Sequence, residues 1–202
     1  MENETRTRVL IAIPCLDTIH QKVVGRLCQI LLSNQEYIIN TLISPMSGIG
    51  ENRNRIAKEF LKTDYEWLLM MDSDNPCPPN VLELIKLDKD VISCPTPINM
   101  NWVNGVNNFY WNVFDDKGFP RKEDGDGLER VEKVGTGCIL IKRKVLEEIP
   151  NPFTTVRGED DKRVIGTDVA FCIRCKNFGF EVYTHWDYRC SHFKEMDLLS
   201  LI

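Results

Sequence analysis

The sequence predicts an α/β fold with a mostly parallel central sheet flanked by helices. Short apolar runs alternate with helical segments between Val9 and Cys94, which is the pattern of a right-handed β-α-β-α-β-α-β unit. The first of these runs is continuously apolar, as expected for a parallel strand that is buried on both faces. An acidic triplet, Asp72-Ser73-Asp74, directly follows another run. Open parallel sheets bind ligands at this end of their strands.

The elements of the first half follow from apolar spacing and from proline. Ile19, Val23, Leu27 and Ile30 recur at helical intervals, whereas Pro78-Pro79 suits the first turn of a helix. We expect strands at Val9–Cys15, Tyr37–Ser44, Trp67–Met71 and Val91–Cys94, and helices at Thr18–Ser33, Glu51–Lys62 and Val81–Leu87.

The second half of the chain is less regular. We expect strands at Val134–Lys142 and Glu181–Thr184, helices at Arg143–Glu148 and Thr167–Phe178, and loops at Lys117–Glu129 and Asn151–Ile165. The segment from Asn99 to Asn112 mixes six asparagines with aromatic residues and shows no clear periodicity. We interpret the 202 residues as a single domain, with halves at residues 1–97 and 98–202.

Composition excludes several classes of protein. Hydrophobic residues make up 43% and charged residues 27%, which excludes wholesale disorder. With 25 basic and 30 acidic residues the net charge is −5, which argues against sequence-independent nucleic-acid binding. No apolar run approaches the ~18 residues that span a bilayer, and the N-terminus lacks the pattern of a signal peptide. We therefore expect a soluble, cytoplasmic protein.

The acidic triplet is the strongest chemical signal. Asp72 and Asp74 alternate at the end of a hydrophobic strand, and carboxylate oxygens are the ligands that suit Mg²⁺ or Mn²⁺. A cation held there neutralises a diphosphate. Alone, two such carboxylates are equally compatible with a helix cap or a strand end.

The chain resembles the GT-A-fold glycosyltransferases, which have a Rossmann-like nucleotide-diphospho-sugar transferase fold, and it is most similar to family-2-like members. The resemblance rests on six segments in the right order: Val9–Pro14 as first strand, Glu51–Arg55 as an "A-R-N"-like helix start, Asp72–Asp74 with Pro76 and Pro78-Pro79 as the D-x-D motif, Gly135–Arg143 as the strand below the sugar, Gly166–Phe171 as a "G-E-D-x-x-F"-like motif, and His192. It implies that residues 1–97 bind a nucleotide sugar and that residues 98–202 bind the acceptor and carry catalysis.

The resemblance also implies roles for individual residues. It gives Asp72, Asp74 and His192 as ligands of Mn²⁺ or Mg²⁺, and Asp168 as the base that deprotonates the acceptor hydroxyl in an inverting reaction. Donor-binding residues are expected at Pro14, Asp17, Arg53, Asp72 and Ser73. Acceptor-binding residues are expected at Trp102, Trp111 and Gly137.

Several of these assignments have simpler alternatives, and His192 would also fit an ordinary hydrogen-bonded polar residue. Arg53 is equally compatible with a solvent-exposed helix position. Asp168 would also suit an N-terminal cap or the first turn of a helix, which does not exclude catalysis. The aromatic side chains of Trp102 and Trp111 would equally serve to pack the irregular half on the sheet. In the "G-E-D-x-x-F"-like motif, Thr167 stands where relatives usually carry glutamate. Asp168 is therefore the one acidic residue left of the usual pair.

The resemblance predicts a metal-dependent glycosyltransferase that moves a sugar, with a UDP-sugar as the favoured donor, to a hydroxyl acceptor of unknown identity. A retaining glycosyltransferase, a nucleotidyltransferase and a non-catalytic nucleotide- or carbohydrate-binding module stay as alternatives. A nucleotidyltransferase would usually carry a glycine-rich phosphate loop with a basic residue after the first strand, which the segment Pro14–Asp17 lacks.

Eight cysteines are many for this length. Several lie in apolar segments, where free thiols behave as small hydrophobic groups. A competing arrangement is a Cys₃His zinc site built from Cys172, Cys175, Cys190 and His192. Helical register places Cys172 and Cys175 on one apolar face beside Phe171, which favours a position in the core.

Overall fold

The computed structural model describes residues 6–103, 106–115, 117–157 and 164–194. Within the described segments, the side chains of residues 99–103, 106–108 and 157 are left undescribed.

A seven-stranded sheet forms the centre of the molecule. Its strands in spatial order are β2 (Ile38–Pro45), β1 (Arg8–Cys15), β3 (Trp67–Met71), β10 (Cys138–Lys142), β4 (Val91–Ser93), β13 (Val182–His185) and β8 (Leu128–Arg130). The pairs β1–β2, β1–β3 and β4–β13 are parallel, whereas β10 runs antiparallel to both of its neighbours and β8 runs antiparallel to β13. The predicted α/β class with a mostly parallel sheet is confirmed.

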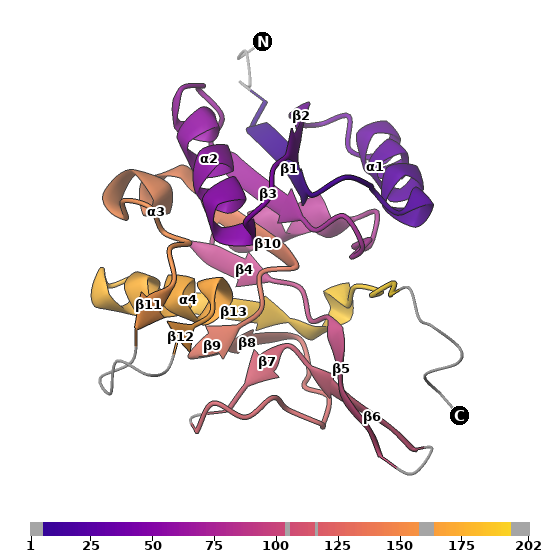
Figure 1. The fold of residues 1–202 in the computed structure, drawn as a ribbon. Helices are drawn as coiled ribbons and strands as arrows, with labels where there is room; N and C mark the ends of the chain where they lie inside the picture. Colours follow the sequence, from indigo (N-terminus) through magenta and orange to yellow (C-terminus); the bar gives the residue numbers. More distant parts are fainter. Residues whose placement is uncertain (1–5, 104–105, 116, 158–163, 195–202) are drawn as a thin grey trace.

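Helices cover both faces of this sheet, as Figure 1 shows. The helix α1 (Gln21–Ser33) and the 3₁₀ helix η1 (Val81–Leu87) pack on one face, through residues such as Ile30 and Leu82. The helices α2 (Ile49–Leu61), α3 (Arg143–Glu148) and α4 (Thr167–Asn177) pack on the other face, through residues such as Phe60, Leu146 and Phe171. Alternate residues of the continuously apolar strands supply both cores, which explains why these strands lack a polar face.

Several predictions for the second half are wrong in detail. The segment after Thr96 forms a hairpin of β5 (Pro97–Val103) and β6 (Val106–Trp111), with a register shift between Asn99 and Asn101. The expected strand Val134–Lys142 is broken at residues 135–137 into β9 (Lys133–Val134) and β10. The expected loops contain β8, β11 (Val156–Arg157) and β12 (Val164–Ile165), and short elements also occur at β7 (Val113–Phe114) and η2 (Trp186–Tyr188).

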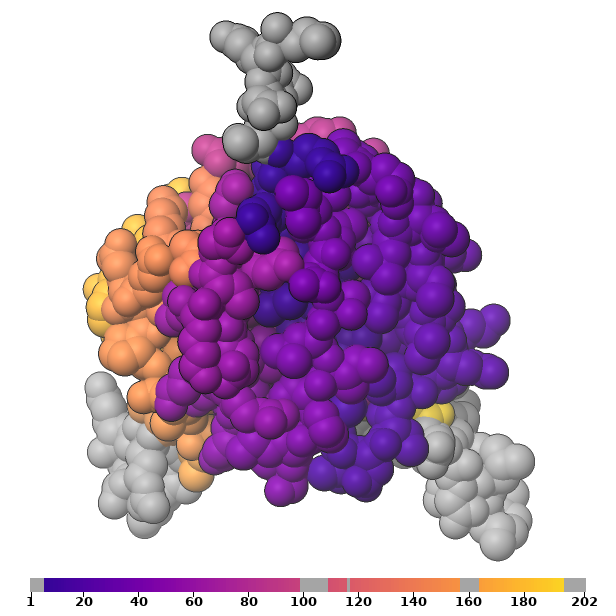
Figure 2. All heavy atoms as spheres, turned by 90° about the horizontal axis from the view of Figure 1, so that it is seen from above, coloured from indigo at the N-terminus to yellow at the C-terminus, as the bar shows by residue number. Residues whose placement is uncertain are grey.

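The first half of the chain dominates one end of the molecule. Figure 2 looks down on this end and shows a surface made mainly of indigo to magenta residues, with orange residues along one side. Among the helices of the described residues, none is long and apolar enough to cross a membrane.

Candidate functional site

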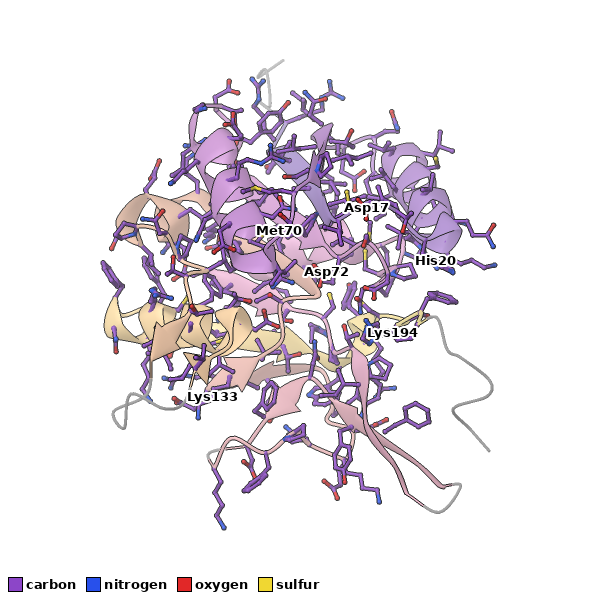
Figure 3. All side chains as sticks on the ribbon, viewed as in Figure 1. Asp17, His20, Met70, Asp72, Lys133 and Lys194 are labelled. Carbon is purple, nitrogen blue, oxygen red and sulfur yellow. The ribbon has the colours of Figure 1, made fainter. Side chains whose placement is uncertain are left out.

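A cleft of about 370 Å³ opens at the carboxyl ends of β1 and β3. Eleven residues line it: Pro14, Cys15, Leu16, Met46, Gly48, Ile49, Asn52, Asp72, Ser73, Asp74 and Lys194. In Figure 3, Asp17, His20, Asp72 and Lys194 lie toward this end of the sheet, whereas Lys133 lies far from it. The cleft has the size of an ordinary small-molecule site and the position expected for ligands of an open α/β sheet.

Arg53 joins the carboxylates of Asp72 and Asp168. Its side chain is only 3% exposed, and its Nη2 donates to both carboxylate oxygens of Asp72 at 2.9 Å. Its Nη1 donates to Oδ1 of Asp168 at 2.7 Å. The two carboxylates raise the pKa of Arg53 against the effect of burial, which alone would lower it. The alternative of a solvent-exposed helix arginine is wrong.

Asp168 lies in the first turn of α4, but Gly166 is the N-cap residue and no side chain caps the helix. Its Oδ1 accepts hydrogen bonds from the hydroxyls of Thr136 at 2.7 Å and Thr167 at 3.0 Å, in addition to the bond from Arg53. Its Oδ2 accepts only the backbone N–H of Thr136, at 3.3 Å, among the described residues. Burial alone would raise the pKa of Asp168, but Arg53 and the threonine donors outweigh burial and hold that pKa below its ordinary value. Asp168 is therefore ionised at neutral pH with one oxygen lightly engaged.

Asn52 positions the start of α2 beside the cleft. Its amide Nδ2 donates to the carbonyl oxygens of Ser44 at 2.7 Å and Cys15 at 3.2 Å, and its Oδ1 accepts from the hydroxyl of Ser44. One buried side chain thus ties α2 to the ends of β1 and β2. Gly48 precedes the helix with φ of +83°, a conformation that side chains other than glycine rarely adopt.

Asp74 lies among basic groups from the C-terminal segment. Its Oδ2 is 2.6 Å from the ammonium of Lys194 and 3.4 Å from Nε2 of His192. Backbone bonds from Cys190 to Pro95 at 2.8 Å and from Phe193 to Asp74 at 2.9 Å hold this segment in place. Burial would raise the pKa of Asp74, but bonds with His192 and Lys194 lower it to about 2.

The pair of Asp74 and His192 fits a divalent cation. The ring Nδ1 of His192 lies 2.8 Å from the carbonyl oxygen of Pro97, which only accepts, so Nδ1 carries a proton. Nε2 then faces the carboxylate, and the contact is attractive only with a proton or a cation between the two groups. A histidine bound to a backbone carbonyl through its other nitrogen is the usual arrangement in metal sites.

Asp72 fits direct metal ligation less well than Asp74. Both of its oxygens bind Arg53, so it would reach a cation in the cleft only through water or after giving up one of these bonds. Burial raises the pKa of Asp72 to about 6, and the bonds from Arg53 limit that rise.

The other predicted site residues lie in varied places. Pro14 and Ser73 line the cleft, whereas Asp17 is exposed and lies outside its lining. The carbonyl of Gly137 accepts the backbone N–H of Asp72 at 2.7 Å. Trp111 donates from Nε1 to Asp124 at 2.8 Å and contacts Trp186 edge-on, as expected for a packing residue. Trp102 belongs to β5, but its side chain lies outside the described residues.

Sequence reasoning missed three functional candidates. Thr136 lies in the predicted strand as an ordinary polar residue, yet its hydroxyl and N–H both bind Asp168. Lys194 belongs to no recognised motif, and it is a candidate because its ammonium contacts the carboxylate of Asp74. Asn52 was visible only as part of the segment Glu51–Arg55. The sole available signal was the proximity of these residues to the recognised motifs.

The structure overturns the Cys₃His zinc arrangement. Cys172 and Cys175 pack in the core beneath α2, α3 and α4, whereas Cys190 packs in the core on the opposite face of the sheet. The sheet separates Cys172 and Cys175 from Cys190, so these three thiols cannot bind one ion.

Comparison with known proteins places the fold. No protein-family model and no curated protein matches the chain. Among solved structures, A197 from STIV has 21% identity and a TM-score of 0.62, over 94% of this chain and 87% of that chain. GalNAc-T7, solved with UDP, GalNAc and Mn²⁺, has 10% identity and a TM-score of 0.57, over 96% of this chain and 44% of that chain. S. aureus TarS has 12% identity and a TM-score of 0.50, over 92% of this chain and 60% of that chain.

The chain shares a GT-A-like, Rossmann-like fold with these structures. It spans about half the length of the GalNAc-T7 and TarS chains that it matches. The more specific resemblance to family 2 stays a prediction.

Proposed function

We propose that the protein is a metal-dependent glycosyltransferase that moves a sugar from a nucleoside-diphosphate donor to a hydroxyl group with inversion. The observation that carries this proposal is the buried guanidinium of Arg53, which binds Asp72 of the acidic triplet and Asp168 together. A carboxylate that is held ionised thereby lies next to the motif expected to bind the donor diphosphate.

The cleft supports a nucleotide as donor. Leu16, Met46 and Ile49 are exposed apolar side chains in its lining, and they offer the flat apolar contact that a nucleobase needs. Polar groups of Ser73 and Lys194 lie in the same cleft, where a diphosphate would contact them. The presence of UDP in the GalNAc-T7 structure favours UDP among the nucleotides.

Asp74 and His192 would hold Mn²⁺ or Mg²⁺, with Asp72 as a direct or water-mediated ligand. When bound, the cation stabilises the negative charge that develops on the leaving diphosphate. Lys194 adds a second positive charge to the same part of the cleft.

Asp168 acts as the base. Its lightly engaged Oδ2 accepts the proton of the acceptor hydroxyl while the acceptor oxygen forms a bond to the anomeric carbon of the sugar. The bond between that carbon and the diphosphate oxygen breaks, and its electron pair leaves with the diphosphate. Attack opposite the leaving group inverts the configuration. Arg53 and Thr136 fix the direction in which the carboxylate points.

Release of UDP from a panel of UDP-sugars, with water as the acceptor, tests this assignment. We expect Asp168→Asn to keep the affinity for UDP and Mn²⁺ and to lower turnover at least ~100-fold, since a positioned general base contributes about that much or more. Asp64→Asn, at an exposed pair with Arg8, is the matched control and should leave turnover unchanged.

Three results would count against the proposal. Full turnover by Asp168→Asn would remove Asp168 as base. If nuclear magnetic resonance showed that the released sugar keeps the anomeric configuration of the donor, the reaction would be retaining and not inverting. Tight UDP binding without turnover of any sugar would favour the non-catalytic module.

A further inference from the structure

Three cysteines from distant parts of the chain meet in the core beneath α1 and η1. Cys94 follows β4, Cys138 begins β10, and Cys190 lies in the C-terminal segment. Their Sγ atoms all lie within 4.8 Å of one another, and none of the three residues is more than 4% exposed. The catalytic proposal uses none of these thiols.

The backbone fixes this arrangement. The N–H of Cys94 donates to the carbonyl of Cys138 at 2.9 Å, and the N–H of Cys190 donates to the carbonyl of Pro95 at 2.8 Å. The hydroxyl of Ser93 also binds the carbonyl of Cys138 at 3.2 Å. Main-chain contacts therefore hold the three residues side by side in the core.

A fourth thiol lies beside the cluster. Cys77, 1% exposed, belongs to the same core, and its thiol lies 3.4 Å from the sulfur of Met71, but its Sγ is not within 4.8 Å of all three clustered thiols. A fourth thiol is therefore available in the same part of the core.

The spacing suits a tetrahedral metal ion. Zinc binds thiolate sulfur at about 2.3 Å, which places the sulfurs of a tetrahedral site about 3.8 Å apart. Sulfurs within 4.8 Å of one another need only small side-chain movements to reach this separation. Soft thiolate ligands select zinc over the Mn²⁺ or Mg²⁺ that the carboxylates of the cleft prefer.

We propose that Cys94, Cys138 and Cys190 bind a structural zinc ion, with Cys77 as the fourth ligand. Each thiol loses its proton to solvent as it forms a bond to zinc, so binding releases protons and involves no oxidation. The ion would join the C-terminal segment to β4 and β10. His192 follows Cys190 by two positions, so the zinc would also hold His192 beside Asp74.

The test is the metal content of the reduced full-length protein. After addition of zinc and removal of loose metal by EDTA and gel filtration, we expect about one zinc per chain by mass spectrometry. Replacement by Co²⁺ should give the intense thiolate-to-cobalt absorption that carboxylate ligands do not produce. Cys138→Ser and Cys190→Ser should each lose the ion.

Two matched controls separate this site from others. Cys172→Ser changes a buried thiol on the opposite face of the sheet and should keep the zinc. Asp74→Asn removes the expected ligand in the cleft and should also keep it, so the result does not depend on the proposed catalytic activity.

Wild-type protein gives a readout that does not rely on variant folding. Titration with zinc should release protons and protect three or four thiols from a thiol reagent. The proposal is overturned if reduced wild-type protein takes up no zinc, if Cys172→Ser loses the ion as readily as Cys138→Ser, or if the cluster is found as a disulfide.

Discussion

A single guanidinium, that of Arg53, neutralises two carboxylates beside the cleft. The three charged groups are supplied by α2, by the end of β3 and by the first turn of α4. The side chain of Arg53 is almost completely buried, whereas those of Asp72 and Asp168 are 23% and 36% exposed, so water screens these contacts only in part. Removal of one partner from such a cluster leaves uncompensated charge and costs far more than the cluster contributes in net terms.

Arg53→Met should therefore lower the free energy of unfolding by about 3–5 kcal/mol at neutral pH. Without the guanidinium, burial and mutual repulsion raise the pKa values of Asp72 and Asp168 above those of the unfolded chain. The resulting loss of folding stability is present at pH values above the pKa values of the unfolded chain. It diminishes as the pH falls and both carboxylates take up protons. Denaturant unfolding of Arg53→Met and of the wild-type protein should show a smaller difference in the free energy of unfolding at pH 5 than at pH 7.5.

Two comparisons make this prediction specific. Asp168→Asn added to Arg53→Met should recover part of the lost stability, because one of the two unpaired, partly buried charges is removed. Lys62→Met, at an exposed pair with Glu59, should cost less than about 1 kcal/mol. An equal loss at both pH values would show that Arg53 acts mainly through packing.

At the scale of elements, the C-terminal segment 190–194 brings His192 and Lys194 to the acidic triplet. It is held by backbone contacts with Pro76, Pro95 and Asp74 rather than by a helix or sheet of its own. His20, the N-cap residue of α1, stacks on Phe193 with ring centres 4.1 Å apart. The segment thus connects α1 with the ends of β3 and β4.

Lys194 competes with a cation for Asp74 in this arrangement. Lys194→Met should bind Mn²⁺ about two- to fivefold more tightly in the absence of nucleotide, since an exposed ion pair is worth about 0.2–1 kcal/mol. The same variant should bind UDP more weakly, because a positive charge is lost from the cleft. Calorimetric titration of each ligand measures both effects.

Lys58→Met, at an exposed position in the last turn of α2, is the control and should change neither affinity. If Lys194→Met left Mn²⁺ binding unchanged, Asp74 would not be the primary ligand. If it left UDP binding unchanged, Lys194 would not contact the diphosphate.

At the scale of the whole molecule, local patterns predicted the elements and non-local contacts decided their arrangement. The strand at Trp67–Met71 has the predicted bounds and the strand at Val9–Cys15 begins one residue earlier, because each is a continuous apolar run. No local pattern indicates that β10 inserts between β3 and β4. The β5–β6 hairpin was missed because asparagine is rare in strands and a register shift interrupts the pairing.

The candidate site shows the same division. Asp72 and Asp74 were visible from the sequence because the motif is contiguous and follows a buried strand. The burial of Arg53 and the bonds from Thr136 to Asp168 depend on packing between α2, α4 and the loop before β10. Such contacts join residues far apart in the chain, so no spacing within the sequence encodes them.

The central claim, a nucleotide-sugar site that depends on the acidic triplet, is tested most directly by thermal unfolding with UDP, GDP, CDP or ADP, each with Mn²⁺ or with EDTA. We predict that UDP with Mn²⁺ at about 100 times its dissociation constant adds about 2.7 kcal/mol of stability. EDTA and Asp74→Asn should each abolish this gain. The claim is contradicted if no nucleotide raises the unfolding temperature, or if UDP raises it equally in the presence of EDTA and in Asp74→Asn.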